Sequence, residues 1–254
     1  MDALIDRLAK RTEPEAGAAL SALRDNPACA AWRKSLAHAV CVQAQVRRDA
    51  EFDYATLEQV VEVLVNGPPA NLRDLQALVL DHLDGLATQL RDGDADGWRQ
   101  FWNTANGKTT TPKSENDGRD VLLPLLRLSL APKGVSVERE GDFAAHKRAD
   151  IVIRHHLSKL PIEIKRNFHA DVWKAMDWQL AGQYAADPEC QGYGIYLVLW
   201  FDPMNGYSIP TPPDGLPRPK TPQEMQSALR LFADRAGLDS AIAIRVIDCG
   251  TAGG

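Results

Sequence analysis

The chain has 254 residues, of which 44% are hydrophobic and 25% are charged, and its formal net charge is −5. This is an ordinary composition for a soluble globular protein, and the length suits one large domain or two small ones. No apolar run approaches the ~18 to 20 residues that span a bilayer, so no membrane segment is expected, and the start MDALIDRLAKR is too charged for a signal peptide.

Helical periodicity dominates the first hundred residues. Apolar residues recur at three- and four-residue spacing in three successive segments, 14–26, 28–52 and 56–65. Residues 66–93 predict a turn and then a long amphipathic helix, with Asn71 as its N-cap and Gly93 near its end. A short aromatic helix is expected at 94–103. Since strand patterns are nearly absent here, we expect a helical N-terminal region over residues 1–105.

The second region, residues 106–254, begins in a polar segment, 103–114, that predicts a loop. Helix and strand patterns then alternate as helix, three strands, helix and strand, at 114–130, 134–143, 149–156, 160–166, 170–187 and 192–201. A proline-rich stretch, a capped helix at 221–237 and a last strand at 242–249 follow. The expected fold is α/β (α+β), a mixed central sheet of about four strands flanked by helices.

Charged residues interrupt two of the predicted strands, RADIVIRHH and LPIEIKR. Because side chains alternate across a strand, Asp150 lies on the face opposite to its neighbouring isoleucines, as do Glu163 and Lys165. A short connection suggests that the two strands are neighbours, which would cluster the charged faces. Two carboxylates held close repel each other, and a divalent cation such as Mg²⁺ or Mn²⁺ offsets that repulsion. A lysine beside such a metal can orient a water and stabilise charge on a phosphate oxygen.

This pattern resembles the PD-(D/E)XK nuclease superfamily, whose fold is restriction-endonuclease-like. In that family a helix precedes three strands, a second helix and a fourth strand, with an Asp on the second strand and E-x-K on the third. The match here is Asp150 followed by Glu163-Ile164-Lys165, and it covers about residues 112–201, the expected core. The resemblance implies that Asp150 and Glu163 bind the metal together with the carbonyl of Ile164, and that Lys165 serves the attacking water. Ala149 stands where the family name has proline.

Other positions fit the resemblance less closely. It implies a metal role for Glu115, at the start of the first helix, although an acid there is equally expected from the helix dipole. Some members carry a Gln and a Tyr on the second helix, which here reads WQLAGQY. Gln179 and Gln183 are four apart and are candidates for substrate binding, with a solvated helix face as the alternative, while Gln179 to Tyr184 is five apart instead of the usual four. Arg148 is a candidate contact to a nucleic-acid backbone.

The function expected from these residues is metal-dependent hydrolysis of phosphodiester bonds, with DNA as the favoured substrate and nucleic acid as the partner. The longer pattern also resembles C-terminal nuclease-like regions of large bacterial proteins, some of them phage-defence proteins, which implies a homodimer or a larger defence assembly. Four scattered cysteines without zinc or disulfide spacing predict reduced thiols and a cytoplasmic location. The alternative is a catalytically silent nuclease-like module that binds nucleic acid or a protein. Taken alone, an Asp followed thirteen residues later by E-x-K is a weak pattern.

Overall fold

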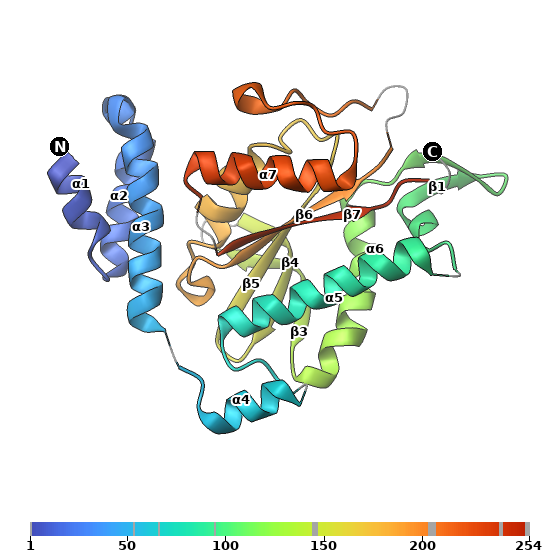
Figure 1. Cartoon of the computed structure of the whole chain (residues 1–254), viewed down its shortest axis with the longest axis horizontal. Helices are drawn as coiled ribbons and strands as arrows, with labels where there is room; N and C mark the ends of the chain where they lie inside the picture. Colours follow the sequence, from blue (N-terminus) through green and yellow to red (C-terminus); the bar gives the residue numbers. More distant parts are fainter. Residues whose placement is uncertain are drawn as a thin grey trace.

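The structure is a computed structural model of the chain and describes residues 2–52, 54–65, 67–93, 95–143, 147–202, 207–238 and 241–251. It begins with a small bundle of helices, α1 (Asp2–Ala9), α2 (Pro14–Asp25) and α3 (Arg33–Glu51), with a 3-10 turn at Pro27–Trp32. A cluster of buried residues holds the bundle together: Ile5, Ala9, Leu20, Leu36 and Ala39. Figure 1 shows it at the left, beside the rest of the molecule.

Helix α4 (Leu57–Leu64) connects this bundle to the body of the molecule, and all of its side chains are exposed. A capping box at Thr56 and Gln59 starts the helix, because each side chain bonds the backbone N–H of the other residue. Within the described part of the chain, no helix has both the length and the apolar character needed to cross a bilayer.

A five-stranded mixed sheet forms the centre of the body, in the order β3-β4-β5-β6-β7. The strands are Ser136–Phe143, Lys147–His155, Ser158–Arg166, Gly194–Trp200 and Ile242–Asp248. Strands β3, β4 and β5 pair antiparallel, whereas β5, β6 and β7 pair parallel. Strand β6 reads GIYLVLW and is buried at every position, as expected of a strand covered on both faces.

Helices cover both faces of the sheet, which confirms the predicted fold class. On one face, α5 (Leu72–Asp92) and α6 (Glu115–Leu130) share a core with residues such as Ile151 and Ile162. On the other face, the π-helix η5 (Met176–Tyr184) and α7 (Pro222–Ala236) pack on residues such as Val198. The remaining short 3-10 segments are Gly97–Phe101, Ala131–Lys133, Pro188–Cys190 and Pro213–Gly215.

Three local features differ from the sequence-based expectation. The polar segment predicted as a loop forms a hairpin of β1 (Trp102–Ala105) and β2 (Lys108–Pro112), because Asn106 and Gly107 both take positive φ, as a tight hairpin turn requires. The boundary expected between the helical N-terminal region and the second region, at residues 105/106, therefore falls inside this hairpin. The helix expected over 170–187 is instead a π-helix between turns. The last strand, β7, joins the same sheet and makes a fifth strand.

Candidate functional site

Asp150 and Glu163 lie side by side on neighbouring strands, as their spacing predicted. Strands β4 and β5 pair with Ile151 opposite Ile162, and one residue further along this register Asp150 comes opposite Glu163. The isoleucines point into the core against α5 and α6. The carboxylates therefore point to the other face of the sheet, at the end where β5 passes into the following turn.

Lys165 completes a short polar network with these two carboxylates. The backbone N–H of Ile164 donates to Oδ2 of Asp150 at 2.7 Å. The ammonium of Lys165 donates to Oε1 of Glu163 and, at 3.3 Å, to the carbonyl oxygen of Ile164. Glu163 and Lys165 are only 3% and 6% exposed. The charges of Glu163 and Lys165 are thus held away from water, beside the half-buried Asp150, where their interactions are strong.

Burial shifts the acidities in this network. Burial and then the neighbouring charge of Asp150 raise the pKa of Glu163 to about 7, against the opposing effect of Lys165. Burial likewise raises the pKa of Asp150, although the hydrogen bond from Ile164 opposes this. Burial alone would lower the pKa of Lys165, but the surrounding carboxylates outweigh it and raise that pKa. A second cation would relieve a real electrostatic cost here, because one lysine does not offset two buried carboxylates.

Glu115 reaches this network from the start of α6. Ser114 caps the helix by accepting a hydrogen bond from the N–H of Asp117 at 3.2 Å. One oxygen of Glu115 accepts the backbone N–H of Arg166, the residue after Lys165, at 2.9 Å. Its charge raises the pKa of both Asp150 and Glu163. The structure therefore brings Glu115 to the predicted site, with a bond to the end of β5 holding it there.

The π-helix η5 lies over the same face of the sheet. In a π-helix the N–H of residue i+5 bonds the carbonyl of residue i, and Ala185 N–H bonds the carbonyl of Leu180 in this way at 2.9 Å. Gln179 and Tyr184, five apart in the sequence, are therefore one turn apart. The hydroxyl of Tyr184 donates to the carbonyl oxygen of Arg148 at 2.8 Å, and burial, with the charges of Glu163 and Asp150, raises the pKa of Tyr184.

The predicted substrate-binding residues are less closely joined to the carboxylates. Gln179 and Gln183 are half-buried on η5, and across the described residues neither forms a hydrogen bond with Asp150 or Glu163. Arg148 is on β4, two residues before Asp150, and its side chain is largely exposed. Its guanidinium lies 3.4 Å from the carboxylate of Glu140, which is not one of the two proposed metal ligands, Asp150 and Glu163.

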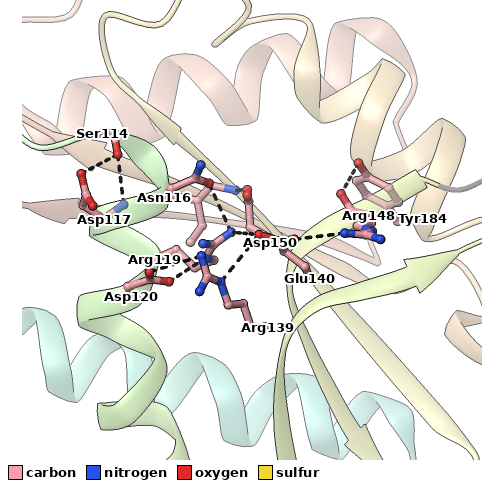
Figure 2. Close-up of polar contacts among 11 residues, drawn as sticks. Ser114, Asn116, Asp117, Arg119, Asp120, Arg139, Glu140, Arg148, Asp150 and Tyr184 are labelled. Atoms are coloured by element: carbon pink, nitrogen blue, oxygen red, sulfur yellow. Dashed lines mark hydrogen bonds and ion pairs between the residues drawn. The ribbon is translucent and has the colours of Figure 1, made fainter.

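Sequence reasoning missed Arg119 and Glu140. Arg119 is 1% exposed on α6, where its guanidinium contacts Glu140 at 3.0 Å and weakly opposes the rise in the pKa of Asp150. Figure 2 shows this group beside Asp150. A signal for Arg119 was present, because it lies three and seven residues before Leu122 and Leu126 on the apolar stripe of the helix. No sequence signal marks Glu140, whose position opposite Asp150 follows from the pairing of β3 with β4.

The donor groups fit a magnesium or manganese ion. Among the residues that the structure describes, no group of three His, Cys, Asp or Glu side chains is arranged to hold a metal. Mg²⁺, however, is often bound through only one or two carboxylates, and substrate phosphates and waters fill its other positions. Asp150 and Glu163 supply two carboxylates on adjacent strands, and the carbonyl oxygen of Ile164 is a third oxygen in the same network, where it accepts from Lys165 at 3.3 Å. Their raised pKa values indicate negative charge that is incompletely balanced within the protein.

Comparison with known families gives one match. Residues 75–203, just over half of the chain, match the family described as Domain of unknown function (DUF8371), so the chain belongs to that family. The matched span runs from α5 through β6 and includes all of the residues discussed above. No curated protein and no solved structure matches the chain.

Proposed function

We propose that this member of the DUF8371 family is a metal-dependent nuclease that hydrolyses phosphodiester bonds, with DNA as its substrate. The observation that carries the proposal is the pair of carboxylates on adjacent strands, the half-buried Asp150 and the buried Glu163, together with the buried ammonium of Lys165. Perturbed acids held together at one end of a sheet are typical of catalytic sites.

Each residue has a role that its position supports. Asp150 and Glu163 hold the metal with the carbonyl of Ile164, and Glu115 adds negative charge from α6. A bound Mg²⁺ or Mn²⁺ supplies the Lewis acidity that makes a water nucleophilic near neutral pH and neutralises charge on the phosphate. Lys165 keeps its proton, since its pKa is raised, and donates hydrogen bonds to the water or to a phosphate oxygen.

For Lys165 to take this role it must release Glu163, to which it now donates. Coordination of Glu163 by a metal would favour this, because the carboxylate charge is then balanced by the ion. The flexible side chain of lysine can swing between partners by rotation about its own bonds. The half-buried Gln179 on the helix above is the candidate contact to a strand of nucleic acid over the carboxylates, whereas the buried Tyr184 joins that helix to β4 through the carbonyl of Arg148.

A cleavage assay tests the proposal. Plasmid, linear duplex, single-stranded DNA and RNA are incubated with the wild type in Mg²⁺, Mn²⁺ or EDTA. We expect metal-dependent cutting that Lys165→Ala abolishes. Lys159→Ala is the matched control, because Lys159 is on the same strand but forms an ion pair with Glu189 at 2.6 Å, at the end away from the acids. It should cut like the wild type.

Circular dichroism and a melting curve are used to check that Lys165→Ala is folded. Retained cleavage by the folded variant would refute the role of Lys165, and absence of cutting by the wild type on every substrate and with both metals would refute the nuclease. In the second case a Mg²⁺ titration followed by thermal shift separates a metal-binding protein from a silent nuclease-like module, in which the Lys165–Glu163 pair is only structural.

A further inference from the structure

Three arginines converge on one carboxylate beside the acid site. The guanidinium of Arg119 donates to Oε1 of Glu140 at 3.0 Å, Arg139 lies 3.6 Å from the same oxygen, and Arg148 lies 3.4 Å from Oε2. They come from three elements, α6, β3 and β4, and Figure 2 shows them around Glu140. We call Arg119, Arg139 and Arg148 the arginine cluster.

Glu140 is directly next to the proposed metal ligands. Strands β3 and β4 pair with Arg139 opposite Ile151 and Gly141 opposite Ala149, so Glu140 comes opposite Asp150. Glu140 also has a φ of +51°, a left-handed conformation that is uncommon for a residue with a side chain and costs free energy. A strained residue at this point in a strand indicates a functional role for its carboxylate.

A second carboxylate, that of Asp120, also contacts the cluster. Arg119 also bonds Asp120 at 3.0 Å, and Arg139 lies 3.5 Å from the other oxygen of Asp120. Arg119 also donates to Oδ1 of Asn116 at 3.2 Å. The second terminal nitrogen of Arg119, Nη2, is buried and has no hydrogen-bond partner among the residues that the structure describes. A buried unsatisfied donor on a charged group is costly, and an anion bound here would remove that cost.

We propose that the arginine cluster binds a backbone phosphate of the nucleic acid next to the one that is hydrolysed. In the protein without nucleic acid, the carboxylate of Glu140 occupies the position of that phosphate. Guanidinium groups recognise phosphate by paired hydrogen bonds. A phosphate bound beside Asp150 would fix the position of the strand relative to the carboxylates. This inference rests on the proposed function, because it takes the same nucleic acid as the ligand.

The sign of one substitution separates this role from a structural one. If Glu140 competes with the phosphate, then Glu140→Gln removes a repulsive charge and tightens binding. If the cluster only joins α6 to the sheet, the same change loosens the structure and gives no tighter binding. A carboxylate as exposed as Glu140 contributes modestly, so we expect a gain in affinity of about two- to fivefold.

The measurement is binding of fluorescein-labelled duplex DNA by anisotropy over a range of salt concentrations. Ca²⁺ replaces Mg²⁺, and a gel verifies that the probe stays intact. Arg139→Ala and Arg148→Ala change side chains that are 52% and 60% exposed, so both proteins should fold. Each should weaken binding and reduce the slope of log affinity against log salt by about one, as loss of one phosphate contact does.

Glu138→Gln and Arg154→Ala are the matched controls. These two residues form the same kind of ion pair, at 2.8 Å, on the same two strands, further from Asp150. Both should bind like the wild type. Equal affinity and salt slope for the wild type, Arg139→Ala and Arg148→Ala would overturn the phosphate site, and so would weakening by the two control substitutions to the same extent.

The outcome for this inference is separate from that for the nuclease. Arginine-dependent binding without cleavage under any condition would keep the phosphate site and refute the nuclease. Metal-dependent cleavage, together with DNA binding that the substitutions in the arginine cluster do not change, would support the nuclease and overturn this inference. Unchanged or weaker binding by Glu140→Gln would overturn the role of Glu140 as the placeholder for a phosphate.

Discussion

Replacing Glu163 with glutamine should remove most of the pH dependence of stability near neutrality. Burial raises the pKa of Glu163 from 4.5 to about 7 in the folded protein, whereas in the unfolded chain the group ionises near its ordinary value. Between these two values the folded state binds more protons than the unfolded state. The free energy of unfolding is therefore highest below about pH 4.5 with respect to this group, and it falls as the pH rises through 7.

The size of the effect follows from the shift. A change of one pKa unit corresponds to about 1.4 kcal/mol, so Glu163 should cost the metal-free protein about 3 kcal/mol between pH 5 and pH 8. The side chain is 3% exposed, so solvent screening reduces this little. The raised pKa of Asp150 adds a change of the same sign in the wild type. Glutamine has nearly the same shape and cannot ionise.

Urea unfolding in EDTA at pH 5 and at pH 8, followed by circular dichroism, measures the difference. The variant should resemble the wild type at pH 5 and lose about 3 kcal/mol less on going to pH 8. Glu138→Gln, a change at an exposed carboxylate on β3, should follow the wild type. Parallel pH dependence of the wild type and Glu163→Gln would refute the argument that burial of this carboxylate controls stability near neutrality.

Further predictions concern the metal and the supports of the site. At pH 8, Mg²⁺ should raise the melting temperature of the wild type but not of Asp150→Asn, and an equal rise in both would exclude Asp150 as a ligand. Asn167→Leu removes two buried hydrogen bonds, to the carbonyl (2.9 Å) and N–H (3.2 Å) of Phe201, and should cost about 2–3 kcal/mol in urea unfolding; a loss under 1 kcal/mol would contradict their importance. Tyr184→Phe loses the bond to the Arg148 carbonyl and should cost about 1 kcal/mol while slowing cleavage; cleavage at the wild-type rate would show that η5 has no part in the reaction.

The sequence by itself determined the strands and their charged faces. Period-two alternation around Asp150 and Glu163 is local, and it places isoleucines on one face and acids on the other whatever the rest of the chain does. The short connection between the two strands then makes them neighbours. Lys165 is two residues after Glu163, so the same alternation places it on the acidic face. The N-caps Asn71 and Ser114 were also readable, because capping depends on side chains within three residues.

Only the tertiary structure decided how other parts of the chain complete the site. Burial of Arg119 and its contact with Glu140 depend on α6 packing over the sheet, and the left-handed backbone of Glu140 depends on its pairing opposite Asp150. The π-helical winding of η5 brings Gln179 and Tyr184 within one turn at a spacing that an ordinary helix would separate further. These features result from contacts between residues distant in the chain, and no local pattern encodes such contacts. The raised pKa of Glu163 has the same origin, since it exists only once the helices packed on the charged face exclude water from it.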